Sequence, residues 1–559
     1  MALSIARGPS LESESGLGST TLAGFLREVT TAYADREAMT FRGGGERVRF
    51  TYRDMWQQSM CIARALIASG VGKDTRVGVL ATNRPEWVVA LFGIALTGAT
   101  CVAVSSFATA SELEQQLRLA DVSILFFERS VASHDFAADL LALCPGLATG
   151  PVGELQSLRL PYLRRVIQID GEPDVLGIAS WSTFLELAAG TPEQLVNAVA
   201  AEISPADLAM VFFSSGTTGK PKGIMQTHRA AAIQCWRAAR ILALQDDVRT
   251  WSANGMFWSG NFAMGMGATL AVGGSLVLQR YFIPGEALQL MAAEKVTYPV
   301  AWPHQWARLE ADPLYLTVDL GALRYVGENS LLRKHPTVHT DWDEPWSAYG
   351  NSETLTLSAV HASGTPAHIR EGNHGFPLPG NIMRIVDPLT GAVLPLGETG
   401  EIAVKGPTLM LGYLKTPPEM AFDEDGFFRT GDGGFIDELG RLHWHGRLND
   451  IIKTGGANVS PLEIDAVLAE YPGVKIAKTV GVPHETLGEM VVACVVAHTD
   501  AKLQEASLRE FVGGRLSSYK VPRRVLFLLE SDLSFTGTNK VKLDSLRELA
   551  VGKLASTPV

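Results

Sequence analysis

Cysteine is scarce in this chain, and the cysteines it has lie far apart. Among 559 residues there are only five, Cys61, Cys101, Cys144, Cys235 and Cys494. Their number is odd and no CxxC pair occurs. These features argue against a disulfide scaffold and a cysteine-based zinc site, and they are typical of proteins from a reducing compartment.

A surplus of positive charge is also lacking. The sequence contains 48 Lys and Arg against 59 Asp and Glu, which gives a net charge of −11. A protein that binds nucleic acid broadly needs a basic excess to neutralise phosphates. We therefore expect no nucleic-acid partner.

The chain has no unbroken apolar run of membrane-span length. Two uncharged stretches come close, residues 87–104 and 262–279, but "TGAT" interrupts the first, and "GMGAT" and "GG" interrupt the second. Because a membrane span is one continuous helix of about 20 residues, we interpret each stretch as a buried helix followed by a buried strand. The N-terminus lacks the apolar core of a signal peptide and carries acidic residues. We expect a cytoplasmic protein without a membrane span.

Clustered metal ligands are missing as well. The segment "HWH" places His443 and His445 on one face of a strand, but no further group of ligands is visible in the sequence. We therefore expect no zinc site at this segment.

The composition that remains is that of a globular protein. Hydrophobic residues make up 46% of the chain and charged residues 19%. Between residues 52 and 130, helical and strand patterns alternate, which predicts a parallel sheet covered on both faces. From about 375 to 445, short runs separated by turns favour an antiparallel sheet or small barrel, and an α+β module follows. The predicted fold class is α/β, with an N-terminal domain over 1–448 and a C-terminal domain over 449–559.

One loop has the composition of an anion site. "SSGTTGKPKG" (214–223) follows the buried apolar run "LAMVFF". Glycines allow successive backbone N–H groups to turn toward an anion, while hydroxyls and lysines add donors and charge. The spacing is not that of a Walker loop. From composition alone, a phosphate grip and a flexible surface loop remain comparable interpretations.

Four further segments make the phosphate interpretation more specific. In chain order the set is "SSGTTGKPKG", "AYGNSE", "FRTGD", "GRLNDIIKTGGANVSPLEID" and "FTGTNKVK". With these segments the chain resembles the adenylate-forming superfamily of acyl-CoA synthetases, adenylation domains and luciferases from about residue 20 to 550. The resemblance implies a large N-terminal domain of two helix-covered sheets and a small β-barrel-like subdomain, with a small mobile α+β C-terminal domain.

The resemblance also implies which residues bind the nucleotide. The residues implied for the phosphates are Ser214, Ser215, Gly216, Thr217, Thr218, Gly219, Lys222 and Ser352. Those implied for adenine and the turn around it are Gly327, Glu328, Asn329, Tyr349, Gly350 and Asn351. Asp432 and Arg447 are implied for the ribose, and Glu353 for Mg²⁺.

The implied reaction has two steps. In the first, a carboxylate attacks the α-phosphate of ATP, and Lys540 contacts both reactants. The loop around Lys540 departs from the family pattern at Ser534, Phe535 and Asn539. In the second step, the C-terminal domain pivots at Asn449 and the thiol of CoA replaces AMP. Residues implied for that arrangement are Lys453, which is catalytic, and Gly455 and Gly456 along the pantetheine path.

The acid is expected to be apolar. Amino-acid adenylation domains place an Asp after Phe in the segment that reads "GMFWSGN" here, and this chain has Trp258 after Phe257. A buried ammonium without a carboxylate is costly. We therefore predict that Phe257 and Trp258 line an acyl pocket in an acyl-CoA synthetase that uses ATP, CoA and Mg²⁺ and is a monomer or homodimer. Two alternatives remain open, namely an acyl-AMP ligase that loads a carrier protein and a non-catalytic protein that binds acyl-adenylate.

Overall fold

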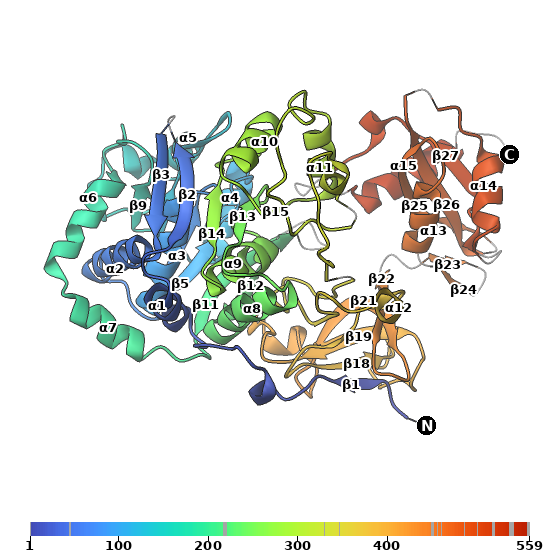
Figure 1. Cartoon of the computed structure of the whole chain (residues 1–559), viewed down its shortest axis with the longest axis horizontal. Helices are drawn as coiled ribbons and strands as arrows, with labels where there is room; N and C mark the ends of the chain where they lie inside the picture. Colours follow the sequence, from blue (N-terminus) through green and yellow to red (C-terminus); the bar gives the residue numbers. More distant parts are fainter. Residues whose placement is uncertain are drawn as a thin grey trace. The chain divides into compact units, whose positions relative to one another are not determined.

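The computed structural model describes most of the chain (Figure 1). The described residues are 2–43, 46–215, 221–328, 330–345, 347–448, 452–454, 457–459, 461–485, 487–499, 501–516, 520–535 and 541–555. They form two compact units: unit 1 is Met1–Ala6, Met383–Ala403 and Arg429–Val559, and unit 2 is Arg7–Ile382 and Val404–Phe428. The predicted domain boundary at 448/449 stays a prediction, because residues 449–451 lie outside the described part.

Unit 2 contains an eight-stranded sheet. In spatial order its strands are β10 (Ile178–Ser180), β9 (Arg165–Gln168), β6 (Ile124–Phe127), β4 (Arg76–Leu80), β5 (Thr100–Ala103), β11 (Leu208–Ser215), β12 (Pro221–Thr227) and β20 (Gly412–Tyr413). The first six strands are parallel, as predicted from the alternating pattern. β12 and β20 add an antiparallel edge that the sequence did not predict. The glycine-rich segment therefore connects two antiparallel strands, β11 and β12.

A second, five-stranded sheet completes the strand framework of unit 2. Its order is β15 (Tyr298–Val300), β13 (Arg249–Ser252), β14 (Ser275–Leu278), β2 (Glu37–Gly43) and β3 (Glu46–Thr51). Two short hairpins stand apart, β7 (Ser130–Val131) with β8 (His134–Asp135) and β16 (Ala359–Val360) with β17 (Phe376–Pro377). One buried apolar cluster includes Val77 of β4 and Leu276 of β14, so the two large sheets share a core.

Helices cover these sheets. They are α1 (Leu22–Ala32), α2 (Tyr52–Ala68), α3 (Pro85–Leu96), α4 (Ala110–Leu119), α5 (Phe136–Leu143), α6 (Trp181–Glu186), α7 (Glu193–Ala201), α8 (His228–Ile241), the π-helix η4 (Asn261–Gly267), α9 (Ala268–Ala271), α10 (Pro284–Ala293), α11 (Pro303–Glu310) and α12 (Ala367–Arg370). In Figure 1, α2, α6 and α7 lie on the left of unit 2, α10 lies above β13 and β15, and α11 lies to their right.

Both uncharged stretches are a helix followed by a strand, as predicted. The first folds into α3 and β5, and the second into η4, α9 and β14. α3 is almost entirely buried, which explains why it is apolar on all sides. Among the helices of the described residues, none has both the length and the apolar character that a bilayer crossing requires.

The described residues of unit 1 form two further sheets and three α-helices. One sheet has the order β1 (Ile5–Arg7), β18 (Ile382–Val386), β19 (Gly400–Lys405), β21 (Phe428–Ile436) and β22 (Leu442–Arg447). The other has the order β24 (Ala457–Val459), β23 (Ile452–Thr454), β26 (Gly488–Ala497) and β25 (Val474–His484), and β27 (Arg524–Phe527) pairs with β26. The helices are α13 (Pro461–Ala469), α14 (Glu505–Gly513) and α15 (Leu543–Ala555). The predicted α+β module beyond residue 450 is confirmed.

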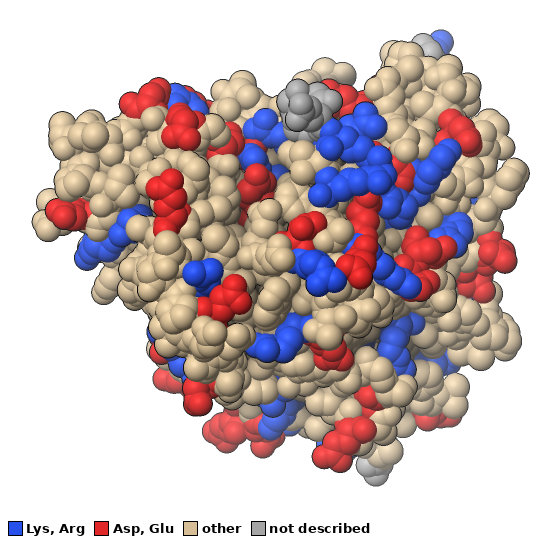
Figure 2. All heavy atoms as spheres, turned by 60° about the vertical axis from the view of Figure 1, so that its left-hand side comes forward, with Lys and Arg blue, Asp and Glu red and all other residues tan. Residues whose placement is uncertain are grey.

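Charges of both signs are interspersed on the face of the molecule that Figure 2 shows. On the hairpin of β2 and β3, Arg47 pairs with Glu294, and Arg49 pairs with Glu37 at 3.0 Å. These basic side chains are therefore matched by acidic ones, in agreement with the overall charge.

Candidate active site

The segment 349–353, "YGNSE", forms a tight turn in unit 2. Tyr349 pairs through its backbone with Ala359, and its side chain is buried. A Cβ at position 350 would lie 2.0 Å from the carbonyl oxygen of Thr356, so only glycine fits there. Thr356 itself has φ 84°, an unusual value for a β-branched residue. Strain of this kind concentrates at functional sites.

Two buried glutamines hold this turn in place. Gln226 of β12 donates from Nε2 to the carbonyl of Ser352 at 2.7 Å. Gln234 of α8 donates to the carbonyls of Leu355 and Leu357 at 2.7 and 2.9 Å. Both glutamines have 0% exposure. Neither glutamine was predicted from the sequence. The only feature that could have indicated them is that each is a polar amide among mostly apolar residues of a strand or helix.

Glu353 is held at both its backbone and its side chain. Its carbonyl accepts a hydrogen bond from the N–H of Met410 at 2.8 Å. One carboxylate oxygen, Oε1, accepts from the hydroxyl of Tyr413 at 2.8 Å. The ammonium of Lys222 lies 4.9 Å from the centroid of the same tyrosine ring. Tyr413 thus contacts both Glu353, the predicted metal ligand, and Lys222, a predicted phosphate contact. Tyr413 itself was not predicted from the sequence.

The turn also meets the predicted acyl segment. The hydroxyls of Ser259 and Ser352 are 3.2 Å apart. Phe257 is 5% exposed, and its ring centroid lies 5.2 Å from that of the half-buried Trp258. Phe107, which is 61% exposed, packs edge-on against Phe257 at 5.5 Å. Phe107 is a further residue that no sequence pattern indicated.

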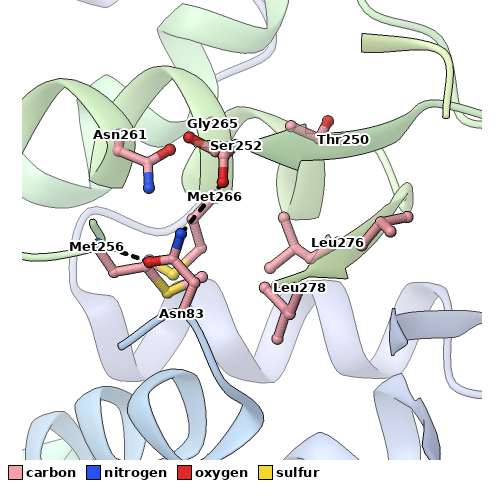
Figure 3. Close-up of a pocket in the computed structure, with 10 residues that line it drawn as sticks. Asn83, Thr250, Ser252, Met256, Asn261, Gly265, Met266, Leu276 and Leu278 are labelled. Atoms are coloured by element: carbon pink, nitrogen blue, oxygen red, sulfur yellow. Dashed lines mark hydrogen bonds between the residues drawn. The ribbon is translucent and has the colours of Figure 1, made fainter. Parts of the chain in front are cut away.

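A small cavity of about 10 Å³ lies against Met256, the residue that precedes Phe257. It is lined by Asn83, Thr250, Ser252, Met256, Asn261, Gly265, Met266, Leu276, Val277 and Leu278. Figure 3 shows Asn83 pointing toward Met256 and Ser252. Its Oδ1 accepts from the N–H of Met256 at 3.0 Å, and its Nδ2 donates to the carbonyl of Asn254 at 2.8 Å. Because neither Phe257 nor Trp258 lines this cavity, it is not the predicted acyl pocket. The hydrogen bonds of Asn83 hold the backbone just before these two residues.

The "GENS" segment is partly described. Glu328 pairs with Arg370 at 3.0 Å, and Ser330 caps the short helix η5 (Leu331–Lys334). A Cβ at Gly327 would meet the carboxylate of Glu344 at 2.2 Å. Burial raises the pKa of Glu344. The segment is therefore surrounded by acidic and basic side chains.

In unit 1, the two residues predicted for the ribose lie together. Asp432 of β21 and Arg447 of β22 face each other in the strand register, and Arg447 Nε lies 3.0 Å from Asp432 Oδ1. Asp432 is 4% exposed, and Arg447 also donates to the carbonyl of Thr430 at 3.0 Å. The cross-strand position thus fixes the direction of the carboxylate.

His443 of "HWH" lies between an acidic and an aromatic side chain. His443 Nε2 lies 3.0 Å from Asp437 Oδ2, and its ring stacks on Phe435 at 4.3 Å. Within the described ranges, no group of three or more His, Cys, Asp and Glu side chains is arranged to hold a metal ion.

Comparison with known proteins assigns the family. Residues 26–414 match the model of the AMP-binding enzyme family, and residues 463–540 match that of the AMP-binding enzyme C-terminal domain. The chain belongs to the AMP-binding enzyme family. This confirms the predicted superfamily.

Similar AMP-binding enzymes match along nearly their whole length. An indenyl-propanoyl:CoA ligase of Mycobacterium tuberculosis is 31% identical over 510 residues, which is 90% of this chain and 94% of the relative. An indoleacetate–CoA ligase of Aromatoleum aromaticum is 30% identical over 521 residues, 91% of this chain and 96% of the relative. The crystal structure of ATP-bound MatB from Rhodopseudomonas palustris is 26% identical, with a TM-score of 0.76, and 95% of this chain aligns with 99% of that one.

Several predicted site residues of this AMP-binding enzyme lie outside the described part. They are Gly216, Thr217, Thr218, Gly219, Asn329, Asn449, Gly455, Gly456 and Lys540. Ser214 and Ser215 end β11, where they pair with Lys222 and Pro221, and Lys453 lies in β23 opposite Asn458. The structure thus brings Lys222, Ser352 and Glu353 together, and separately Asp432 and Arg447, while their roles toward a nucleotide stay predictions.

Proposed function

We propose that this AMP-binding enzyme activates an apolar carboxylic acid with ATP to acyl-AMP and then transfers the acyl group to the thiol of CoA. The observation that carries the proposal is the 3.2 Å contact between Ser259 and Ser352. It joins the predicted acyl segment to the turn that holds Glu353, so the groups that would contact acid and phosphate belong to one arrangement.

The charges nearby suit the first step. A carboxylate must approach the α-phosphate of ATP, so two anions have to meet before pyrophosphate leaves. Lys222, whose ammonium lies over Tyr413, would offset negative charge on the departing phosphates. Cationic side chains such as Lys222 would provide the positive charge that a helix N-terminus provides in other phosphate sites.

The donor set at Glu353 fits a magnesium ion. Mg²⁺ in nucleotide sites keeps several waters and uses one or two carboxylates together with the substrate phosphates. Glu353 offers one carboxylate whose Oε1 is fixed by Tyr413. When bound, Mg²⁺ would neutralise charge on the phosphate oxygens. Glu353 would hold it, and the hydrogen bonds from Met410 and Gln226 keep the Glu353 backbone in place.

The aromatic residues suit an apolar acid. Phe107, Phe257 and Trp258 form a continuous group of rings, and aromatic pairs of this kind contribute dispersion and shape without requiring a charged substrate. The similarity to an indoleacetate–CoA ligase supports acids that carry a ring.

ATP–pyrophosphate exchange over a panel of fatty, aromatic and polycyclic acids tests the proposal. We expect exchange with at least one apolar acid, and a CoA thioester when CoA is added. Exchange without a thioester would assign the acyl group to another acceptor, such as a carrier protein. If no acid supports exchange, the remaining interpretation is a non-catalytic protein that binds acyl-adenylate.

A further inference from the structure

Tyr413 touches two predicted ligands of the nucleotide, and no sequence motif singles it out. We propose that Tyr413 is a positioning residue: its hydroxyl orients Glu353 toward Mg²⁺, and its ring supports Lys222 toward phosphate. This inference rests on the proposed function, because it assumes that Glu353 and Lys222 serve a metal-bound nucleotide.

Strand pairing places Tyr413 beside the Lys222 end of β12. β20 pairs antiparallel with β12, and Tyr413 is opposite Ile224. Lys222 and Ile224 are two residues apart in β12, so their side chains lie on the same face of the strand. Tyr413 is therefore the neighbour of Lys222 across the ladder, which explains the 4.9 Å approach of its ring to the ammonium.

The hydroxyl of Tyr413 fixes a carboxylate whose backbone is already fixed. The carbonyl of Glu353 accepts from Met410 N–H at 2.8 Å and from Gln226 Nε2 at 3.3 Å. The remaining freedom is that of the side chain, and the 2.8 Å bond to Tyr413 removes it. A carboxylate has about four lone-pair positions, so one hydrogen bond at Oε1 leaves capacity for a cation.

A hydrogen bond to a carboxylate has two opposing effects on a metal. It withdraws some charge from the oxygen, which weakens binding, and it holds the carboxylate in the binding geometry, which strengthens binding. Outer-shell partners of metal ligands typically contribute about 10- to 100-fold to metal affinity, so orientation outweighs charge withdrawal.

The two parts of Tyr413 can be separated by substitution. Tyr413→Phe removes the hydroxyl and keeps the ring under Lys222. Tyr413→Leu removes both. Tyr162, which is 56% exposed, offers the matched control Tyr162→Phe, the same change at a site without these contacts.

Calorimetric titration measures the binding of ATP without metal and of ATP with Mn²⁺ or Mg²⁺ to the full chain. We expect Tyr413→Phe to weaken metal–ATP binding about tenfold and to leave metal-free ATP binding as in the wild type. Tyr413→Leu should in addition weaken metal-free ATP binding about threefold, the size of an exposed cation–π contact. Tyr162→Phe should match the wild type in both titrations.

A double-mutant cycle with Glu353→Gln decides whether the hydroxyl acts through this carboxylate. The tenfold effect of Tyr413→Phe should disappear in the Glu353→Gln background. The proposal is overturned if Tyr413→Phe binds metal–ATP like the wild type, if its defect persists undiminished beside Glu353→Gln, or if the wild type does not distinguish ATP from metal–ATP. These titrations need no carboxylic acid, so they test the role of Tyr413 separately from catalysis. If the titrations give the expected results but no acid supports pyrophosphate exchange, the proposed function is refuted and the role of Tyr413 is not.

Discussion

Asp432 is an acid with almost no exposed surface that faces an arginine across a strand pair. If both contact the ribose, Asp432→Ala should weaken ATP binding about tenfold, since a charge-assisted hydrogen bond is lost. The wild type should also use 2′-deoxy-ATP less well than ATP, and Asp432→Ala should reduce that preference. Pyrophosphate exchange with both nucleotides measures this. Equal use of the two nucleotides by the wild type would remove Asp432 from the nucleotide site.

Lys540 provides a prediction that the motif order alone supports. Lys540→Ala should lower adenylation by about a hundredfold or more, near 3 kcal/mol, because one cation that contacts both reactants is lost. Thioester formation from supplied acyl-AMP should remain nearly intact. Lys542→Ala, at an exposed neighbour, is the control and should change neither step. If supplied acyl-AMP also fails to react in Lys540→Ala, the division of labour between the two steps is wrong.

We expect His228 to make the stability of the fold depend on pH. It is fully buried at the start of α8, where burial lowers its pKa from 6.5 to about 4 despite nearby Asp207, while Lys73 acts in the same direction as burial. Its Nδ1 accepts from the N–H of Leu22, so the neutral ring is the form that fits. Between pH 6.5 and about pH 4, His228 is protonated in the unfolded chain but neutral in the folded one. The contribution of His228 to stability is therefore complete above about pH 6.5 and falls toward pH 4.

Calorimetry of thermal unfolding across this range tests the titration of His228. The wild type should lose about 3 kcal/mol of stability between pH 6.5 and 4 through this residue. His228→Asn keeps an acceptor near Leu22 but cannot be protonated, so its Tm should fall less steeply over the same window. Parallel Tm curves for the two proteins would show that His228 does not titrate there.

At the level of elements, α8 supports the site from behind. Gln234→Leu would remove the buried amide that donates to the carbonyls of Leu355 and Leu357, which should cost about 1–3 kcal/mol of stability. Because these carbonyls belong to the turn that follows Glu353, the KM for ATP should rise as well. Gln115→Leu, at an exposed position of α4, is the control and should leave both the Tm and the KM unchanged. A loss of Tm with an unchanged KM would limit Gln234 to stability.

Elements with a strong local pattern were predictable, and those formed by tertiary contacts were not. The apolar runs of β4, β5, β6 and β11 are enough to identify these segments as buried strands. β12 begins with "PKG", which has the composition of a turn, and it becomes a strand because β11 and β20 pair with its two edges.

The same division applies to the site residues. Asp432, Glu353 and Lys222 stand in segments whose order identifies them. Tyr413 and Phe107 are single aromatic residues in loops or short strands, and only the fold brings them to Glu353 and Phe257. These contacts join residues that are far apart in the chain. A single sequence, read without an alignment, does not reveal them.

At the level of the whole chain, the two steps should be separable. Asn449→Pro fixes φ at the predicted hinge, and Gly456→Leu fills the predicted pantetheine path. Both should keep pyrophosphate exchange while thioester output falls. Gly552→Leu is the control, because a Cβ there meets nothing within 4 Å. If both variants form acyl-CoA at the wild-type rate, the hinge and the thiol path are elsewhere.

The π-helix η4 begins at Asn261, just after Phe257 and Trp258 of the predicted acyl segment. At Gly265, a Cβ would lie 2.3 Å from Asn261 Oδ1, so the widened turn accommodates that amide only because glycine stands there. A π-turn contains one residue more than the α-turn it replaces, and each residue of a helix corresponds to about 100° of rotation. The loss of a single codon within 261–267 would thus turn the side chains on one side of the deletion to a new direction. If Phe257 and Trp258 line the acyl pocket as predicted, one three-nucleotide deletion in η4 would change the acid that the enzyme accepts and leave every predicted ATP-binding segment unaltered.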